Sequence, residues 1–513
     1  MNGANTFMMF SIVAYMVAVI IIGFVYAKRN DQVGDFYLGG RKLGPIVTAM
    51  SAEASDMSSW LLMGLPGVAY LSGFADAGWT AIGLAIGTYV NWLVVARRLR
   101  RYSVVAGNAI TLPEFFSNRY HDSGKLLTWI AALVILIFFI PYTAAGFASC
   151  GKLFNSLFGV DYTTAMIVGA VVVVAYTAIG GFLAESATDL IQGIIMSIAL
   201  LGILIFGAVV VGGFGAVFEE SSSLPGYLSM TFTHNVASGK AESYGLVTII
   251  STMAWGLGYF GMPHILLRFM AIGDEKKLVF SRRIAVTWVV VSLTVAVLIG
   301  VVGHAMSVNG SIPLLEGTAS ETIIIRMSEL LSHTGTISAL IAGVVLSGIL
   351  AATMSTSDSQ LLVASSSVTE NLLKDCFGIK LPADTTMHIA RAAVITVAII
   401  AAFIARDPDS SIFVIVSFAW AGFGAAFGPV MLFALFWRRS NVYGAVAGMV
   451  SGGVTVFVWK YLVRPLGGVW DIYELLPAFI FACVAIVVVS LLTEAPGKEI
   501  TDEFDTVIKM GNQ

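Results

Sequence analysis

Thirteen apolar stretches follow one another along this chain and are separated by short polar segments. Most are close to the roughly 20 residues that a helix needs to cross the hydrocarbon core of a bilayer. The alternation of polar and apolar residues typical of membrane barrel strands is missing. The pattern therefore predicts an all-α integral membrane protein. The predicted spans are 6–27, 44–73, 77–96, 126–154, 162–181, 189–213, 244–270, 284–307, 335–366, 388–405, 411–437, 442–463 and 473–493.

Composition and the placement of charge agree with this class. Hydrophobic residues make up 58% of the chain and charged residues 12%, with a mean hydropathy of +0.88, whereas soluble domains carry about 25% charged residues. If the N-terminus lies outside, 22 of the 28 lysines and arginines fall on the inner side. This asymmetry favours a multi-pass protein of the cytoplasmic membrane with the N-terminus outside and the C-terminus in the cytoplasm. We expect the polar tail, 494–513, to be poorly ordered.

Span 44–73 departs from the apolar pattern. It carries two carboxylates, Glu53 and Asp56, and four serines between Ser51 and Trp60. A charged side chain near the bilayer centre costs roughly 2.5–3.5 kcal/mol on insertion scales, so it normally faces a cavity and marks an ion or substrate pathway. We interpret this stretch as a cation and substrate site.

Span 244–270 shows a second interruption. Between Ala254 and His264 it holds three glycines and Pro263, which a regular helix tolerates poorly. Irregular backbone at membrane depth survives only when it is buried in protein or lines a cavity, so two interrupted spans indicate one shared cavity. They are the second and seventh spans, five apart. Because five is odd, a five-span repeat would place its second copy upside down, as in inverted-repeat transporters.

This repeat predicts the organisation of the chain. An extra N-terminal helix and loop precede the first repeat, an extracellular loop joins the two repeats, and two helices and a cytoplasmic tail follow the second repeat. The predicted units are, in that order, 1–43, 44–213, 214–243, 244–437, 438–493 and 494–513.

A third polar patch lies in span 335–366. It contains Ser347, Thr353 and the run from Ser355 to Ser359, which includes Thr356 and Asp358. The neighbouring hydroxyls of Ser355 and Thr356 suit a hard cation such as Na⁺. The alternative is that these hydroxyls bond the carbonyl one turn back and allow close helix packing.

Four motifs in this order together resemble the sodium:solute symporter family, and within it the bacterial sodium/proline symporters. The motifs are Ser55–Gly67 (Ser-Asp-Met-Ser-Ser-Trp-Leu-Leu-Met-Gly-Leu-Pro-Gly), Gly180-Gly181 with Asp189 and Gln192, Trp255–Leu266 (Trp-Gly-Leu-Gly-Tyr-Phe-Gly-Met-Pro-His-Ile-Leu), and Met354–Leu362 (Met-Ser-Thr-Ser-Asp-Ser-Gln-Leu-Leu). The resemblance runs along nearly the whole chain. It implies thirteen helices, an inverted five-helix repeat of the leucine-transporter type, and Na⁺-driven uptake of proline by alternating access.

The resemblance also implies a sodium site and a substrate site. Asp56 would be the essential carboxylate beside the sodium ion. The implied sodium ligands are the carbonyls of Ala54, Met57 and Ala352 and the hydroxyls of Ser355 and Thr356. The implied substrate residues are Ser58, Trp60, Gly64, Tyr142, Trp255, Tyr259 and Pro263.

The chemistry of these residues suits proline. Free N–H groups of an interrupted helix can take its carboxylate, and aromatic faces suit its ring and its ammonium. Without the resemblance, Trp255 and Tyr259 could equally be packing residues four apart on a helix. Tyr142, which follows Pro141, could be an interfacial or packing tyrosine.

Three acidic residues are candidates for coupling or gating. Glu53 stands where the family pattern leads us to expect a small residue, three positions before Asp56. Two carboxylates this close in a low dielectric disfavour joint ionisation, so Glu53 is either protonated or helps to hold a cation. The alternative places it at a hydrated cytoplasmic mouth. The resemblance makes Asp189 important for gating or coupling, although it could be a carboxylate stabilised by a helix N-terminus. Asp358 is a candidate for a second cation role.

Other classes of function have less support in the sequence. There is no nucleotide-binding glycine-rich loop, no metal-ligand spacing among the three cysteines, and no nucleophile with a plausible base, so we expect no enzymatic activity. The expected partners are the solute, the sodium ion and the bilayer, without nucleic acid or an obligate protein partner. Two alternatives stay open: the same mechanism with another small amino acid or a carboxylate solute, and a symporter-like substrate sensor.

Overall fold

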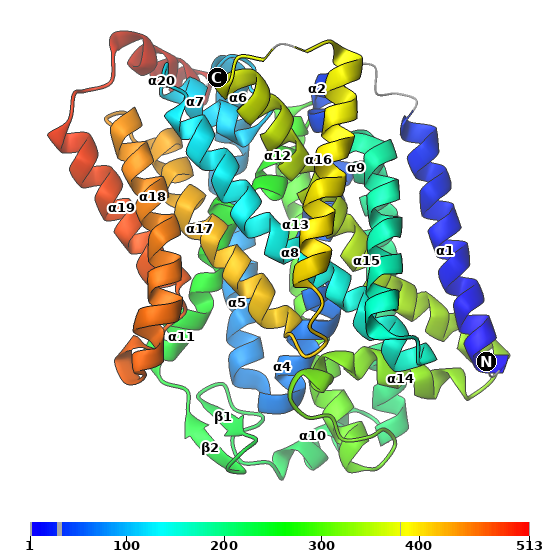
Figure 1. The fold of residues 1–513 in the computed structure, drawn as a ribbon. Helices are drawn as coiled ribbons and strands as arrows, with labels where there is room; N and C mark the ends of the chain where they lie inside the picture. Colours follow the sequence, from blue (N-terminus) through cyan, green and yellow to red (C-terminus); the bar gives the residue numbers. More distant parts are fainter. Residues whose placement is uncertain (1–2, 28–32, 380, 512–513) are drawn as a thin grey trace.

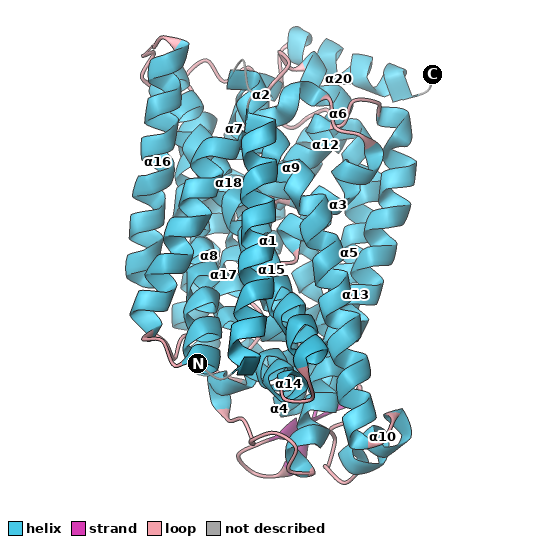
Figure 2. Ribbon diagram, turned by 90° about the vertical axis from the view of Figure 1, so that its right-hand side faces the viewer, coloured by secondary structure: helices cyan, strands magenta, loops and turns pink. Residues whose placement is uncertain are grey.

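The long helices run between two ends of one bundle (Figures 1 and 2). The computed structural model describes residues 3–27, 33–379 and 381–511. One end of the bundle, at the top of Figure 1, holds α2, α6, α20 and the C-terminus, and we call it the C-terminal end. The opposite end holds the N-terminus, α10, α14 and the β1–β2 hairpin, and we call it the N-terminal end.

The first half of the described chain is entirely helical in its regular structure. It contains α1 (Gly3–Ala27), α2 (Val33–Leu38), α3 (Pro45–Asp56), α4 (Leu65–Ser72), α5 (Phe74–Val90), α6 (Ala96–Val105), α7 (Leu112–Arg119), α8 (Leu126–Phe158), α9 (Tyr162–Val211) and α10 (Phe214–Ser222). Short 3-10 or π-helical turns carry the label η, and η2 (Trp60–Gly64) lies between α3 and α4.

The second half adds an antiparallel hairpin, β1 (Phe232–Asn235) paired with β2 (Lys240–Ser243), in which Phe232 faces Ser243. The helices that follow are α11 (Leu246–Met253), α12 (Pro263–Ala271), α13 (Leu278–Val308), α14 (Ile323–Ser332), α15 (Thr336–Ser366), α16 (Ala383–Ile404), α17 (Ile412–Phe436), α18 (Val442–Val458), α19 (Leu475–Leu492) and α20 (Lys498–Gly511). The turn η4 (Ala254–Phe260) joins α11 to α12, and η8 (Trp459–Val463) extends α18.

Every predicted span corresponds to a helical segment of the described chain. Ten helices in this part are long and apolar enough to cross a membrane, and the number is eleven if the bent pair Leu246–Phe260 and Pro263–Ala271 counts as one span. The predicted count of thirteen is not confirmed by these criteria. The two remaining predicted spans are the broken helix 44–73, whose longest apolar piece is Trp60–Ser72, and the short segment Tyr162–Ala178.

Two predicted spans, 162–181 and 189–213, correspond to the two helical parts of α9, which is interrupted by non-helical backbone at Gly181. The helical backbone is interrupted at Gly181, whose φ of 65° lies in the left-handed region, and the second helical part follows directly. Only glycine adopts this conformation without strain, which explains how the chain changes direction there without a loop.

Both predicted helix interruptions are confirmed. Helix α3 ends at Asp56, and Met57 leaves the helical region with ψ at 71° before the chain turns again at Trp60. The second interruption consists of η4 and Met262, after which α12 begins with Pro263. Proline has no N–H to donate, so it fits the first turn of a helix but would break its interior.

The interrupted segment η4 lies unusually close to α5. A methyl group on Gly256 would overlap the carbonyl of Gly83, and one on Gly87 would overlap the carbonyl of Gly256. Because none of these three positions carries a side chain, the two backbones touch directly. This contact fixes the depth at which η4 presents Trp255 and Tyr259.

The expectation of a poorly ordered tail is wrong. Residues Lys498–Gly511 form α20, which packs against α6 through the buried side chains of Phe504 and Val507. Arg438 donates to both carboxylate oxygens of Asp505 at 3.0 Å, and this interaction holds the pKa of Asp505 below its usual range. The apolar positions of the tail follow the helical period, and α6 provides the surface that this face needs.

Candidate functional site

The hydroxyls of α15 reach across to the end of α3. Ser355 Oγ donates to the Ala54 carbonyl at 2.7 Å and also lies 3.2 Å from the Ala352 carbonyl. Thr356 Oγ1 donates to the Ser55 carbonyl at 2.8 Å. The structure therefore brings four of the five predicted sodium ligands to the end of α3. Met57, the fifth, is fully buried at the helix break itself.

Other hydroxyls of α15 behave differently. Ser347 and Thr353 donate to the carbonyls four residues earlier, at 2.8 and 2.9 Å, which is the local bond expected of serine and threonine inside a helix. Helix α15 is continuous from Thr336 to Ser366. The bonds from Ser355 and Thr356 to α3 are therefore a feature of these two positions and not of every hydroxyl in the polar patch.

The oxygen atoms at this place have the chemistry that Na⁺ requires. They are carbonyl and hydroxyl oxygens, which are hard ligands, and the residues that carry them are 0 to 2% exposed. No carboxylate is among them, so an ion bound there would keep most of its positive charge unneutralised. Such a set suits an ion that must be both bound and released.

Asp56 joins the two interrupted helices. Its Oδ2 accepts a hydrogen bond from the hydroxyl of Tyr259, in η4, at 2.6 Å. Its backbone carbonyl, freed by the end of α3, lies 3.4 Å from Trp60 Nε1 and 3.5 Å from the Tyr142 hydroxyl. In the described part of the chain, Oδ1 has no hydrogen-bond partner. Asp56 thus links the predicted sodium ligands to three of the predicted substrate residues.

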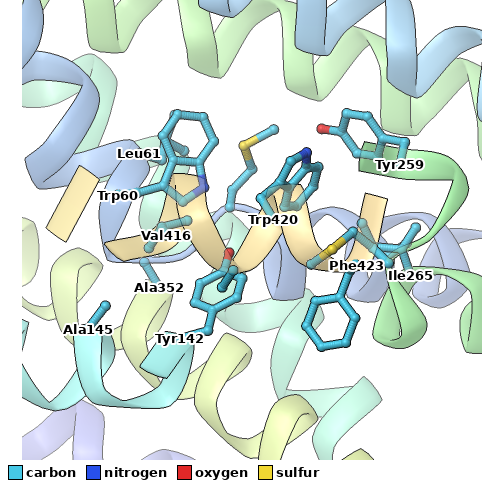
Figure 3. Close-up of a cluster of buried hydrophobic side chains, with 14 of the residues drawn as sticks. Trp60, Leu61, Tyr142, Ala145, Tyr259, Ile265, Ala352, Val416, Trp420 and Phe423 are labelled. Atoms are coloured by element: carbon cyan, nitrogen blue, oxygen red, sulfur yellow. The ribbon is translucent and has the colours of Figure 1, made fainter. Parts of the chain in front are cut away.

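The aromatic residues predicted to bind the solute form one buried cluster. The rings of Trp60 and Trp255 are stacked with centroids 5.8 Å apart. Figure 3 shows Trp60, Tyr142, Tyr259 and Trp420 in one cluster of buried side chains, with the hydroxyl of Tyr142 directed toward Trp60. All four side chains are about 1% exposed.

The remaining predicted substrate residues have local roles at the breaks. Ser58 Oγ accepts a hydrogen bond from the Trp60 N–H at 3.3 Å, at the start of the turn η2. Gly64 lies against Phe413 of α17, which a side chain at this position would crowd. Pro263 starts α12.

Sequence reasoning missed the contribution of α17 to this cluster. Trp420 Nε1 donates to the Trp255 carbonyl at 2.7 Å, and its ring meets Tyr259 edge to face at 5.1 Å. Phe413 meets Trp255 edge to face at 4.9 Å. The signal in the sequence was the segment from Trp420 to Gly428, where small residues alternate with aromatic ones in an otherwise apolar span.

Glu53 is buried at the centre of the bundle. It is 1% exposed, which contradicts the alternative of a hydrated mouth. Its Oε1 accepts a hydrogen bond from Trp92 Nε1 at 2.8 Å, whereas Oε2 has no hydrogen-bond partner among the described residues. Glu53 and Asp56 therefore each present one unbonded carboxylate oxygen on neighbouring turns of α3.

Asp189 belongs to a buried ionic cluster that contacts α3 at Ser51, before its break. Its Oδ2 accepts hydrogen bonds from Ser51 at 2.7 Å and from Arg268, in α12, at 3.3 Å. Arg268 also pairs with Glu185, one turn before Asp189 in α9. Glu185 and Asp189 lie in the part of α9 that begins after the kink at Gly181, and the side chains of Ser51 and Arg268 hold the Asp189 carboxylate.

Asp358 borders the same cluster through its neighbour. Ser359 donates its hydroxyl to Glu185 and its N–H to Asp358 Oδ1, the latter at 2.7 Å. Arg268 NH2 donates to the Ser359 hydroxyl at 2.9 Å. Sequence reasoning missed Arg268 and Glu185. The available signal was a lone arginine inside a predicted span, which needs an acidic partner at that depth.

Comparison with known proteins places the chain in a family. The sequence profile of the sodium:solute symporter family matches residues 36–452. The chain is a member of the sodium:solute symporter family. It is 44% identical over 503 residues to the sodium/proline symporter of Salmonella typhimurium, covering 98% of this chain and 96% of the relative. It is also 44% identical over 488 residues to the high-affinity proline transporter PutP of Bacillus subtilis, covering 95% of this chain and 98% of the relative.

A solved structure confirms the fold of this family member. The substrate-bound, outward-open state of a Na⁺-coupled sialic acid symporter superimposes with a TM-score of 0.78 over 96% of this chain and 99% of that chain, at 18% identity. The likeness extends over the whole bundle and confirms the predicted all-α, leucine-transporter-type fold.

The buried ionic cluster yields a test of stability. Replacing Arg268 by alanine leaves Glu185 and Asp189 without their cation, which typically costs about 3–5 kcal/mol. We expect a large fall in the thermal unfolding midpoint of the detergent-solubilised protein. Arg326→Ala is the matched control, because Arg326 and Glu329 form a partly exposed pair of a kind typically worth about 0–1 kcal/mol. Equal, small effects of both substitutions would contradict this view of the cluster.

Proposed function

We propose that this protein is a secondary active transporter that takes up L-proline together with Na⁺. Two relatives with 44% identity over nearly the whole chain are a sodium/proline symporter and a proline transporter. The observation that carries the proposal is the contact between the hydroxyls of Ser355 and Thr356 and the carbonyls at the end of α3, next to Asp56. It supplies a neutral oxygen site for the ion beside an aromatic site for the solute.

The proposed sodium ligands are the five oxygens implied by the family resemblance, contributed by Ala54, Met57, Ala352, Ser355 and Thr356. Asp56 would attract the ion without being a direct ligand. The proposed substrate residues are Ser58, Trp60, Gly64, Tyr142, Trp255, Tyr259 and Pro263, together with Trp420, which holds Trp255 in place. Asp189 and Asp358 would act through the Arg268 cluster, which ties α9 and α15 to α12.

Binding of Na⁺ and binding of proline would be coupled because both sites use the break in α3. The ion would hold α15 against α3. At the break in α3, the carbonyl of Asp56 accepts hydrogen bonds from the side chains of Trp60 and Tyr142. Binding of Na⁺ would therefore order the residues that receive proline. In thermodynamic terms each ligand would raise the affinity for the other by the same factor.

The proposed location is the cytoplasmic membrane, with the N-terminal end of the bundle outside. The distribution of lysine and arginine supports this orientation. Lys28 and Arg29, which contribute to it, lie outside the described residues. The proposed division of the chain follows the predicted repeat, with 44–213 and 244–437 as its two inverted copies. Each copy contains one interrupted helix.

Other functions are weaker proposals. The fold serves many solutes, so another small amino acid or a carboxylate solute would use the same mechanism with a different pocket. A substrate sensor would keep the pocket and lose transport. We expect no chemical step, since the relatives are transporters and the proposed site holds and releases its ligands unchanged.

Uptake into proteoliposomes tests the function directly. With an inward Na⁺ gradient we expect accumulation of labelled L-proline, and with K⁺ in place of Na⁺ we expect none. Competition by other amino acids and by simple carboxylates separates the solutes. Proline accumulation that does not depend on Na⁺ would contradict the proposed coupling. Na⁺-driven uptake of another solute, without uptake of proline, would contradict proline as the substrate.

The proposed division of roles within the site predicts two different kinetic defects. Thr356→Ala removes one oxygen ligand, so we expect the Na⁺ concentration for half-maximal uptake to rise about tenfold, equivalent to ~1.4 kcal/mol. Trp255→Ala should instead raise the KM for proline and leave the Na⁺ dependence nearly unchanged. Thr353→Ala is the matched control, because Thr353 bonds only its own helix. An unchanged KM for proline in the Trp255→Ala variant would contradict the assignment of Trp255 to the substrate site.

Glu53 provides a further proposal about coupling. With Asp56 on the next turn and one unbonded oxygen on each carboxylate, Glu53 would hold a proton or help to hold a cation. Na⁺-driven uptake by wild type should then depend on pH from mildly acidic to mildly alkaline conditions. Glu53→Gln keeps the acceptor for Trp92 and should flatten this profile. Superimposable profiles would rule out a role for Glu53 in the pH dependence.

A further inference from the structure

Two buried carboxylates at the end of α3 have no basic partner among the described residues. Glu53 and Asp56 are 1% and 0% exposed, and none of the ion pairs of the described chain includes either of them. Arg268, on α12, pairs with Glu185 and Asp189 instead. Two uncompensated negative charges at membrane depth are expensive, so this pair of acids requires a positive partner.

Both acids are directed at the place where α5 meets η4. Trp92 lies in η3 (Asn91–Val95), the continuation of α5, and donates to Glu53 Oε1 at 2.8 Å. Tyr259 of η4 donates to Asp56 Oδ2 at 2.6 Å. Each acid thus uses one oxygen to accept from an aromatic side chain at this junction. The second oxygens, Glu53 Oε2 and Asp56 Oδ1, have no hydrogen-bond partner in the described chain.

Helix α5 and its continuation bring further unbonded polar atoms to the junction. Thr88 and Asn91 are fully buried, and neither the Thr88 hydroxyl nor the Asn91 amide has a hydrogen-bond partner among the residues that the structure describes. Thr88 follows Gly87, whose backbone touches η4, and faces the hydroxyl of Tyr259. Asn91 lies one turn further along the same face. Buried polar groups of native proteins are almost always bonded, so these atoms indicate a ligand between α3 and α5.

A proton shared by the two carboxyl groups does not account for this arrangement. Such a proton would join an oxygen of Glu53 to an oxygen of Asp56 by a hydrogen bond, and the two oxygens concerned make none. A metal cation instead takes several oxygen ligands at once and needs no contact between them. Carboxylate, hydroxyl and amide carbonyl oxygens are the hard ligands that an ion such as Na⁺ prefers.

The balance of charge points to the same ion. The sodium site proposed between α3 and α15 contains no carboxylate, so a single Na⁺ there leaves Glu53 and Asp56 with one positive charge between them. A second Na⁺ beside these two acids brings the sum to zero. Proline is a zwitterion and adds no net charge. The fully loaded site is then neutral, which is the state that a low-dielectric interior favours.

We propose a second Na⁺ site between α3 and α5, so that two Na⁺ accompany each proline. Its ligands are Glu53 Oε2, Asp56 Oδ1, Thr88 Oγ1 and the side-chain carbonyl of Asn91. The site is separate from the one between α3 and α15, because it uses side chains directed toward α5 and not the carbonyls at the end of α3. The inference rests on the proposed function, since it takes the same ion and the same solute.

Equilibrium binding of radioactive Na⁺ to the purified full-length protein, without proline, tests the site. We expect two Na⁺ per molecule of wild type and one per molecule of Glu53→Gln, which keeps an acceptor for Trp92 but removes the charge. Thr356→Ala should keep one site of wild-type affinity and weaken the other about tenfold. Glu370→Gln is the matched control and should bind two, because Glu370 is also buried but has Lys374 as its cation at 2.6 Å.

The Na⁺ dependence of proline uptake gives a second measurement. Its Hill coefficient should fall from near two in wild type to near one in Glu53→Gln. Thr88→Val removes one ligand without changing the shape of the side chain and should raise the Na⁺ concentration that fills the second site about tenfold. Thr80→Val is its control and should leave Na⁺ binding unchanged. It removes another buried, unbonded hydroxyl of α5, but one that lies about two turns away and lines the open cavity beside Trp255.

Thermal unfolding in K⁺ shows whether Glu53→Gln is folded. Because the substitution removes one of two adjacent uncompensated charges, the variant should unfold at a higher temperature than wild type. Na⁺ should then raise the unfolding temperature of wild type more than that of the variant, since wild type binds one ion more.

The outcomes that overturn the inference are distinct from those that overturn the proposed function. One Na⁺ per molecule of wild type would remove this site and leave Na⁺-driven proline uptake standing. Two Na⁺ that persist in Glu53→Gln would exclude Glu53 as a ligand. A Glu53→Gln variant that alters the pH dependence of uptake but not the number of bound Na⁺ would make the pair of acids a proton site. Wild type that binds no Na⁺ at all would contradict the proposed function as well.

Discussion

The structure depends on one constraint: the backbone of α3 stops being helical at membrane depth, and the carbonyls freed there need partners other than water. They find them in two hydroxyls of a helix about 300 residues further along the chain. Ser355 and Thr356 donate to the carbonyls of Ala54 and Ser55, while the Asp56 carbonyl accepts from the Ser58 N–H and also from Trp60 and Tyr142. The carbonyl oxygens that need hydrogen-bond donors in the folded protein are also oxygens that a hard cation can bind. The break therefore costs regular helical hydrogen bonds and at the same time provides the proposed sodium site.

Charge and aromatic side chains occupy different regions around this break. Toward the C-terminal end, Arg268 holds Glu185 and Asp189 together and links α12 to α9. Toward the N-terminal end, Trp255 and Phe413 form an aromatic floor under an open cavity. An aromatic partition can shift by small ring movements, whereas a buried ionic cluster resists separation because parting its charges is expensive. The break in α3 therefore lies between an ionic cluster on one side and aromatic contacts on the other.

The apolar pattern and the break residues allowed much of this to be predicted. The positions of all predicted spans, the interruptions near Met57 and Gly261, and the meeting of Ser355 with Ala54 follow from local signals and from the family resemblance. The close junction within α9 could not be predicted in the same way, because the helix is interrupted at Gly181 alone where a longer connecting segment was expected. The helix α20 was also missed, since its apolar face has a reason to form only once α6 lies beside it. Arg268 and Trp420 act through partners far away in sequence, which no single segment reveals.

The central claim is that the ion and the solute share the broken helix, and equilibrium binding of labelled L-proline to the purified protein tests it most directly. If the claim holds, Na⁺ raises the affinity of the wild-type protein for proline about 5- to 150-fold relative to K⁺, the usual range for coupled sites. Thr356→Ala should lose most of this difference while binding proline in K⁺ as the wild type does. A proline affinity that is the same in Na⁺ and in K⁺ for the wild-type protein would contradict the account.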